Sequence, residues 1–238
     1  MTLDGEVALV TGASRGLGYH SALALAKAGA HVVALARTVG GLEELDDEIR
    51  EAGGSATLVP IDLTDFEGLD KLAPALAERW GRLDVLFGNA GYLAPLTPLA
   101  HLQDREWQRS FDVNVTANFR LLRALDPLLR AAPKGTALFV TSGAVRSNRA
   151  YAGPYSLAKA ALDALVRTYA NENRQTDVTA NLVDPGTLRT RMRAQYAPGE
   201  DPETVTPPQE LATLMPQLVT QSRKRTASTY DFPDRCWR

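Results

Sequence analysis

Four polar residues have types that suit an acid/base reaction at an oxygen atom: Asn114, Ser142, Tyr155 and Lys159. The last two lie four positions apart at the start of an Ala- and Leu-rich segment, which predicts a helix running to about Tyr169. On such a helix both side chains project from one face, one turn apart. A free phenol has a pKa of about 10, and a neighbouring ammonium lowers it by favouring the phenolate. Tyr155 is therefore a candidate general acid/base for an alcohol or carbonyl oxygen, although Tyr-x-x-x-Lys pairs also occur on solvated helix faces.

A glycine-rich turn near the N-terminus indicates nucleotide binding. A short apolar run at residues 6–10 passes directly into Thr-Gly-Ala-Ser-Arg-Gly-Leu-Gly at residues 11–18. Good helix formers follow from Ser21 to Ala28, and Gly29 is a C-terminal cap. Strand, glycine-rich turn and helix form the context of the dinucleotide fingerprint, because glycines let the backbone approach a pyrophosphate and the helix start offers unpaired amides. An ordinary tight turn needs one glycine, so three favour the nucleotide interpretation.

Apolar β-favouring runs alternate with longer helical patterns along the chain. Strands are expected at Val7–Thr11, His31–Ala36, Ala56–Ile61, Val85–Gly88, Ala137–Ser142 and Val178–Val183. Helices are expected near Gly16–Ala28, Gly41–Ala52, Phe66–Trp80, Glu106–Ala131 and Pro154–Asn171. The alternation predicts the α/β class, as a single Rossmann-type doubly wound domain over residues 1–238 with a parallel sheet of six to seven strands and helices on both faces. Ligands bind such sheets at the carboxyl ends of the strands. The motifs of this chain fall at those ends, at Gly12, Arg37, Asp62, Asn89, Ser142 and Pro185.

The motifs and their order resemble those of the short-chain dehydrogenases/reductases, in the small single-domain branch of that family. The resemblance runs from about Leu3 to Thr190, and it includes residues 11–18, Asn89-Ala90-Gly91, the four polar residues and Pro185-Gly186. It implies an NAD(P)-dependent oxidoreductase that transfers a hydride between its nicotinamide cofactor and a small-molecule carbonyl or secondary alcohol.

The resemblance also implies roles for individual residues. Tyr155 would be the proton donor or acceptor, and Lys159 would lower its pKa and hold the nicotinamide ribose. Ser142 would orient the substrate oxygen, and Asn114 would anchor a proton-relay water. The cofactor-binding residues that it implies are Gly12, Ser14, Arg15, Gly16, Leu17, Gly18, Arg37, Asp62, Leu63, Asn89, Ala90, Gly91, Tyr155, Lys159, Pro185, Gly186, Leu188 and Thr190.

The end of the second expected strand bears on cofactor choice. NAD-preferring enzymes usually place Asp or Glu there to bond the 2′-hydroxyl of the adenine ribose. This chain has Ala36 followed by Arg37, and a guanidinium can pair bidentately with a 2′-phosphate. Arg15 could supply a second cation. We therefore expect NADP(H) to be favoured over NAD(H), the alternative being that Arg37 simply begins a solvated loop.

Two departures from the family pattern affect the sheet. Gly88 stands where the family usually carries a second Asn. The C-terminal tail, residues 226–238, replaces the usual apolar last strand, although Thr226–Phe232 could still form a short one. A homodimer or homotetramer is expected from the family, and the atypical tail puts the tetramer in doubt.

The resemblance implies that residues 187–206 fold over the substrate as a lid. Five arginines in or near this lid could meet an acidic substrate or an acyl carrier: Arg146, Arg149, Arg189, Arg191 and Arg193. Residues two apart do not share a helix face, so only Arg189 and Arg193 would act together. A solvated lid surface explains these arginines equally well.

Composition excludes several other classes of protein. With 238 residues and 45% hydrophobic content, the chain can bury one large core. Lys and Arg number 26 against 28 Asp and Glu, so a net charge of −2 leaves no electrostatic footprint for nucleic acid. No apolar run reaches the length of a membrane span, and the first residues lack the features of a signal peptide. One cysteine, Cys236, gives no disulfide framework, so a cytoplasmic location is expected.

Two other functions on the same fold stay open. An NAD-using epimerase or dehydratase usually has a larger C-terminal substrate domain, and only about 50 residues follow Gly186 here. A non-catalytic dinucleotide sensor tends to lose the Tyr or the Lys, and this chain keeps both. No metal site is expected, because the three histidines lack metal-like spacing. Ser142 also lacks the Gly-x-Ser-x-Gly elbow of a hydrolase.

Overall fold

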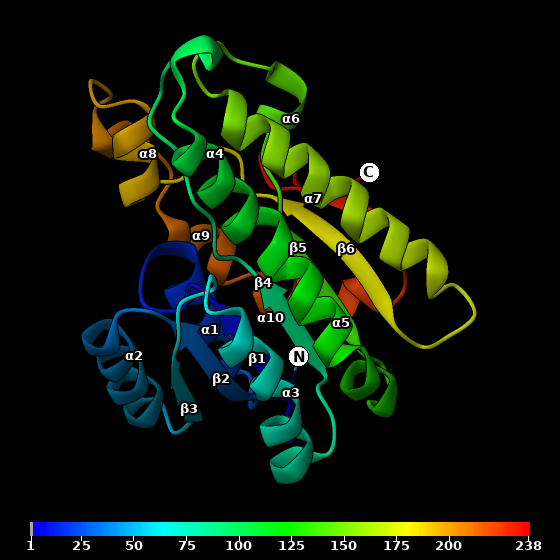
Figure 1. The fold of residues 1–238 in the computed structure, drawn as a ribbon. Coiled ribbons are helices and arrows are strands. Elements are labelled where there is room, and N and C mark those ends of the chain that lie inside the picture. Colours follow the sequence, from blue (N-terminus) through cyan, green and yellow to red (C-terminus); the bar gives the residue numbers. More distant parts are fainter. Residues whose placement is uncertain (1) are drawn as a thin grey trace.

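A computed structural model, which describes residues 2–238, places one sheet of eight strands at the centre of the molecule (Figure 1). The strand order is β3-β2-β1-β4-β5-β6-β7-β8. Seven strands are parallel: β1 Val7–Thr11, β2 His31–Ala36, β3 Ser55–Pro60, β4 Val85–Gly88, β5 Thr136–Val140, β6 Thr179–Asp184 and β7 Thr229–Asp231. The last, β8 (Cys236–Trp237), is antiparallel to β7. The predicted Rossmann-type α/β fold is confirmed.

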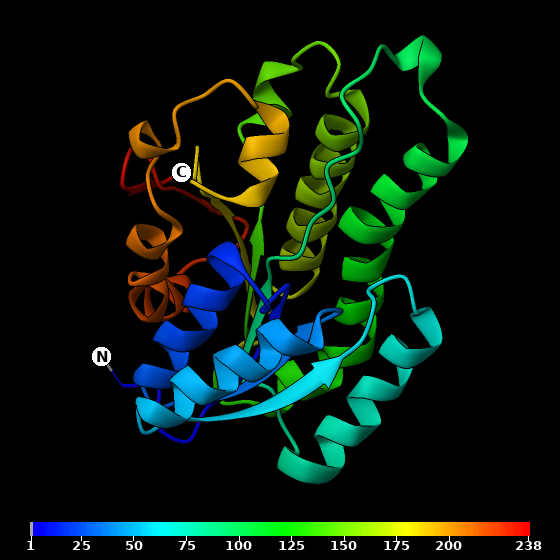
Figure 2. The same cartoon turned by 90° about the vertical axis from the view of Figure 1, so that its left-hand side faces the viewer.

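Helices cover both faces of the sheet, as the two perpendicular views show (Figure 2). They are α1 Gly16–Lys27, α2 Val39–Glu51, α3 Phe66–Trp80, α4 Asp104–Phe111, α5 Ala117–Ala131, α6 Ala144–Ser147, α7 Gly153–Glu172, α8 Arg191–Tyr196, α9 Pro208–Ala212 and α10 Met215–Ser222. One core packs α1, α2, α9 and α10 on the sheet, through residues such as Leu25, Leu42 and Leu218. A second core packs α3, α5 and α7 on the other face, with Leu121 and Leu162 fully buried. Both faces of the central strands are therefore apolar, which explains their continuous hydrophobic sequences.

The expected single helix over Glu106–Ala131 is in fact interrupted. A π-helical turn, Asp112–Thr116, separates α4 from α5. Asn114 lies in this turn, and its side-chain amide donates to the carbonyl oxygens of Ser110 (2.8 Å) and Tyr92 (2.9 Å). A side chain that bonds the backbone of the preceding turn and of another segment favours such a local widening, and π-turns of this kind are frequent at functional sites.

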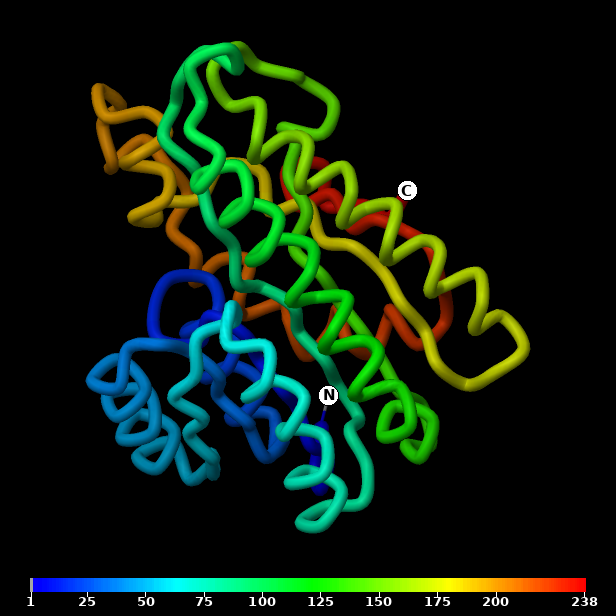
Figure 3. The backbone as a smooth tube through the Cα atoms, in the orientation of Figure 1, coloured from blue at the N-terminus to red at the C-terminus, as the bar shows by residue number. Residues whose placement is uncertain are grey.

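The C-terminal tail returns to the sheet, as the tube in Figure 3 shows. Strand β7 pairs with β6 in parallel, with Asp184 opposite Asp231, so the short final strand expected within Thr226–Phe232 is present. The sequence analysis did not anticipate β8, which adds a hairpin through Tyr230 opposite Trp237. None of the helices described is both long and apolar enough to span a bilayer.

Candidate active site

A cavity of about 1040 Å³ lies at the carboxyl ends of the parallel strands. Every strand-end motif that the sequence singled out contributes to its wall, and so do most of the predicted cofactor-binding residues. Together these wall residues are Gly12, Ser14, Arg15, Gly16, Leu17, Arg37, Asp62, Leu63, Asn89, Ala90, Gly91, Ser142, Tyr155, Lys159, Pro185, Gly186, Leu188 and Thr190. Two predicted site residues, Gly18 and Asn114, lie behind the wall. Gly18 is buried where a Cβ would overlap the carbonyl of Gly12, so its place is in the packing of α1 against the turn.

The glycine-rich turn leaves backbone donors free at the start of α1. Gly12 and Gly16 both have positive φ, 68° and 57°, a conformation that favours glycine. The N-cap position is Arg15, whose side chain makes no capping hydrogen bond. The first amides of a 12-residue helix, at Gly16 and Leu17, therefore face the cavity without an intrahelical partner. Free amides at the positive end of a helix dipole suit a phosphate group.

Thr11 and Asn89 join the end of β1 to the end of β4. The Thr11 hydroxyl accepts from the backbone amides of Asn89 and Ala90, both at 3.0 Å. The Asn89 side chain donates to the Thr11 carbonyl at 2.9 Å. These bonds fix the floor of the cavity beneath the glycine-rich turn. Sequence reasoning quoted Thr11 within a motif but gave it no role, and its position at a strand end was the available signal.

Gly88 has a steric explanation. A Cβ at this position would overlap the ring of Phe139, which lies beside it on β5. The Asn that the family usually carries here would therefore collide with a fully buried aromatic side chain. Glycine at this strand end therefore makes room for the ring of Phe139.

This match gives a stability prediction. Gly88→Ala should lower the free energy of unfolding by about 1–3 kcal/mol, because the core has no room for the methyl group. In a protein that already carries Phe139→Leu, Gly88→Ala should lower the free energy of unfolding by less than it does in the parent. Gly40→Ala is the control, since its Cβ would meet nothing within 4 Å. Denaturant unfolding measures the four variants and the parent, and a Gly88→Ala variant as stable as the parent would contradict the explanation.

Tyr155 and Lys159 project from the first turns of α7 into the cavity, opposite the end of β5. Lys159 is 2% exposed, and its Nζ donates to the Val140 carbonyl at 2.8 Å. The same Nζ lies 5.9 Å from the centre of the Tyr155 ring. A hydrogen bond joins the hydroxyls of Tyr155 and Ser142, which follows β5. The structure thus brings together three of the four predicted catalytic residues.

Burial has the largest effect on the pKa values of Tyr155 and Lys159. It raises the pKa of Tyr155 to about 12, with the Asp184 carboxylate adding to the rise and the Ser142 hydrogen bond opposing it. Burial also lowers the pKa of Lys159 to about 8, against the opposing charge of Asp163 one turn later on α7. Tyr155 is therefore a neutral phenol near pH 7, the form that donates a proton. The lowering of the Tyr155 pKa by Lys159, which the resemblance implied, stays a prediction.

Asn114 supports the wall from behind. Its side chain is fully buried, and its Oδ1 accepts from the Tyr92 amide at 3.1 Å. The Asn114 carbonyl in turn accepts from the side chain of Asn118 at 2.9 Å. A Cβ on Gly91 would lie 3.2 Å from Asn114 Oδ1 and 3.7 Å from Lys159 Nζ. Asn114 therefore holds the segment after β4 beside Lys159, and its relay-water role stays a prediction.

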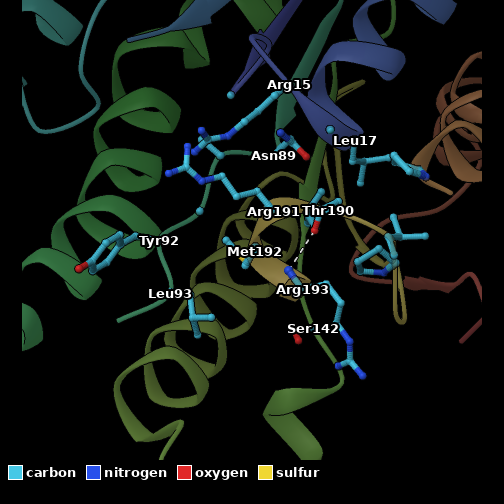
Figure 4. Close-up of a pocket in the computed structure, with 18 of the residues that line it drawn as sticks. Arg15, Leu17, Asn89, Tyr92, Leu93, Ser142, Thr190, Arg191, Met192 and Arg193 are labelled. Carbon is cyan, nitrogen blue, oxygen red and sulfur yellow. Dashed lines mark hydrogen bonds between the residues drawn. The ribbon is translucent and has the colours of Figure 1, made fainter. Parts of the chain in front are cut away.

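The segment after β6 crosses the mouth of the cavity. Figure 4 shows Thr190, Arg191, Met192 and Arg193 of this segment among the side chains that line it. The Thr190 hydroxyl accepts from the amide of Arg193 at 3.3 Å and so caps α8. Gln195 donates to the Leu93 carbonyl at 3.2 Å, which ties α8 to the opposite wall.

Most of the arginines that the sequence suggested for binding an acidic substrate form ion pairs with carboxylates of this chain. Arg189 pairs with Glu203 at 2.6 Å, and Arg193 pairs with Glu200 at 2.5 Å. Arg146 pairs with the buried Asp184 at 2.8 Å. Arg189 and Arg193 are each held by a glutamate of the same segment, and their joint action on a substrate stays a prediction. Arg149 stacks on the ring of Tyr196 at 5.0 Å.

The fold and the cavity define a dinucleotide-dependent oxidoreductase of the Rossmann type, and comparison with known proteins narrows this class. A model of the short chain dehydrogenases matches residues 6–201. The oxidoreductase YciK of Escherichia coli K12 is 34% identical over 233 residues, 96% of this chain and 92% of YciK. A short chain dehydrogenase of Shigella flexneri 2a complexed with NADP has a TM-score of 0.92 at 33% identity, covering 96% of this chain and 97% of that one. Another, from Escherichia coli CFT073 and complexed with NADPH, has a TM-score of 0.88 at 34% identity, covering 96% and 97%.

The chain belongs to the short-chain dehydrogenase/reductase family. It is accordingly an NAD(P)-dependent oxidoreductase.

Proposed function

We propose that the protein interconverts a carbonyl compound and its secondary alcohol with NADP(H), and that Tyr155 exchanges the proton with the substrate oxygen. One observation carries this proposal. The hydroxyls of Tyr155 and Ser142 and the ammonium of Lys159 meet at one part of a cavity whose wall also includes the glycine-rich turn. An oxygen placed between the two hydroxyls would accept a hydrogen bond from each, which both orients a carbonyl and polarises it.

The residues present fit a dinucleotide. Free amides at Gly16 and Leu17 suit its phosphates, and Gly91 leaves open the space beside Lys159 Nζ where a side chain would intrude. Lys159 would hold ribose hydroxyls there by donating hydrogen bonds. When bound, the nicotinamide ring supplies or accepts the hydride, and this chain supplies the proton at Tyr155 Oη.

Reduction is the direction that the protonation state favours. A phenol whose pKa burial raises to about 12 is almost entirely protonated near pH 7, so it can donate to the oxygen of a carbonyl undergoing reduction. Oxidation needs the phenolate, which is scarce under the same conditions. Turnover is tested by following the absorbance of the reduced nicotinamide with a panel of ketones, aldehydes and secondary alcohols. No turnover of any of them by the wild-type protein would count against the proposal.

Two features support NADP(H) over NAD(H). The end of β2 has Ala36 and Arg37 in place of a carboxylate, and Arg37 lines the cavity. Two of the related structures are complexes with NADP and NADPH. Arg37 pairs with Asp62 at 3.3 Å, but both side chains are exposed, at 54% and 38%. An exposed pair contributes little, so Arg37 can turn to a 2′-phosphate at small cost.

Cofactor choice gives a direct prediction. NADPH should bind more tightly than NADH by about 10- to 150-fold, the range for one charge-assisted pair. Ala36→Asp with Arg37→Ile should reverse the order, because it adds an acceptor for a 2′-hydroxyl and removes the partner of the phosphate. Arg50→Ile is the control, since Arg50 is also exposed and paired with an aspartate, Asp46. Calorimetric titration measures the affinities, and equal binding of the two cofactors by the wild type would contradict the assignment.

A further inference from the structure

Among residues 2–238, three arginines at the cavity make no ion pair with an acidic residue: Arg15, Arg109 and Arg191. Arg109 lies over the ring of Tyr92, 4.8 Å from its centre. Arg37, Arg189 and Arg193 line the same wall and pair with Asp62, Glu203 and Glu200 respectively. Arg15 and Arg191 therefore have neither a carboxylate nor an aromatic ring as a partner among these residues, and their charge is available to an anion from outside the chain.

These two arginines extend from neighbouring pieces of backbone. Thr190, which precedes Arg191, has its methyl group 3.5 Å from the Cβ position of Gly16, which follows Arg15. Figure 4 shows the side chain of Arg191 reaching from the start of α8 toward that of Arg15. The glycine-rich turn and the segment after β6 therefore meet on opposite sides of the same stretch of the cavity.

The backbone that carries Arg191 is held in place from three directions. The Thr190 hydroxyl caps α8 by accepting from the amide of Arg193. Gln195 donates to the Leu93 carbonyl on the far wall. Met192 Cε lies 3.7 Å from the Cβ position of Gly91. The backbone position of Arg191 is therefore set by the fold, which limits the entropy lost when its side chain binds an anion.

Two guanidinium groups that face one another repel unless an anion lies between them. The free amides of Gly16 and Leu17 are directed to the same stretch of the cavity. Resting on the function proposed above, we infer that Arg191 and Arg15 close from opposite walls on the diphosphate bridge of the dinucleotide. A diphosphate carries two negative charges, one for each guanidinium, and its oxygens accept bidentate hydrogen bonds.

An anionic group on the substrate fits these observations less well. The reacting group is at Tyr155, and it is Met192 of α8 that lies by Gly91 and Lys159 at that part of the cavity. Arg191 extends instead toward the glycine-rich turn. The diphosphate is the anion that this turn is built to hold.

The test compares Arg191→Gln with Arg189→Gln, a lid arginine that lines the same wall and pairs with Glu203. Calorimetry would measure binding of three probes: NADPH, 2′-phospho-ADP-ribose, which keeps the diphosphate without the nicotinamide, and 2′-AMP, which lacks the diphosphate. We expect Arg191→Gln to weaken the first two by about 10-fold or more and 2′-AMP by less than about twofold. Arg191→Lys should restore part of the loss as a point charge, and Arg189→Gln should change none of the three by more than about twofold.

Three results would overturn the inference. Unchanged binding of NADPH would show that Arg191 makes no contact with the cofactor. An equal loss for 2′-AMP would assign the guanidinium to the 2′-phosphate or to a general field effect. Unchanged cofactor binding with a raised KM for an acidic ketone would assign it to the substrate. If the proposed function itself were wrong, the wild-type protein would bind none of the three probes, and this outcome is distinct from the three above.

Discussion

Tyr155→Phe is expected to lower kcat/KM for the best carbonyl substrate by about 10²–10⁴, the contribution of a positioned general acid. The ring stays and only the hydroxyl is lost, so NADPH affinity should stay within about twofold of the wild type. Steady-state kinetics and calorimetry on the same preparations measure both quantities. The Phe variant should also fold normally, because the Tyr155 hydroxyl faces the cavity and not the core.

Tyr151→Phe is the matched control for this experiment. Tyr151 lies four residues before Tyr155, in the loop that precedes α7, and is 59% exposed, so loss of its hydroxyl should change neither rate nor affinity. A near-normal rate for the Tyr155→Phe variant would show that Tyr155 does not transfer the proton. A large loss of NADPH binding in this variant would instead show that the hydroxyl mainly holds the cofactor.

Lys159→Met should have the second largest effect, because it removes a charge that is assigned two tasks. Met keeps the length of the side chain and suits a site that is 2% exposed. Loss of the ribose contact should weaken NADPH binding by about 10-fold or more, since hydrogen bonds from a charged donor contribute about 1.5–3 kcal/mol. At saturating cofactor and below pH 8, kcat for alcohol oxidation should fall further, because the phenolate loses a neighbouring cation.

The pH dependence of cofactor binding separates these tasks. Burial lowers the pKa of Lys159 to about 8, so its ammonium is present below that pH and lost above it. NADPH affinity of the wild-type protein should therefore fall as pH rises through about 8, and this step should be missing in Lys159→Met. An identical pH dependence of NADPH affinity in both proteins would show that Lys159 does not contact the ribose. An unchanged kcat for alcohol oxidation in Lys159→Met would show that Lys159 does not lower the pKa of Tyr155.

The sequence predicted the parallel sheet well because its strands are buried on both faces. Runs 7–11 and 31–36 are apolar apart from Thr11 and His31, and their observed bounds match the predicted ones. The tail was harder to predict, because a two-residue strand such as β8 depends on pairing with β7 and carries no pattern of its own. The π-turn at 112–116 was missed for a similar reason. Its cause is the bonding of Asn114 to Tyr92, 22 residues earlier in the chain.

The candidate site, like the fold, could be predicted from the sequence only in part. Motif order and strand ends located the cavity wall, including Tyr155, Lys159 and Ser142. Ion pairing could not be predicted, because whether Arg193 meets Glu200 or a substrate depends on the path of residues 191–200. The pKa of Tyr155 could not be predicted either. Spacing on α7 placed a cation near the phenol, whereas the burial that raises its pKa comes from packing around the cavity.

The central claim is that hydride passes between the nicotinamide and the carbon of a substrate carbonyl while Tyr155 supplies the proton. Its most direct test uses NADPH labelled with deuterium at nicotinamide C4, in each of the two epimers, with a ketone that the protein turns over. We predict that one epimer alone transfers deuterium to the carbinol carbon of the product, detected by mass spectrometry, and that Tyr155→Phe abolishes this transfer. Oxidation of NADPH that leaves no deuterium in the alcohol with either epimer, or equal transfer by the Phe variant, would contradict it.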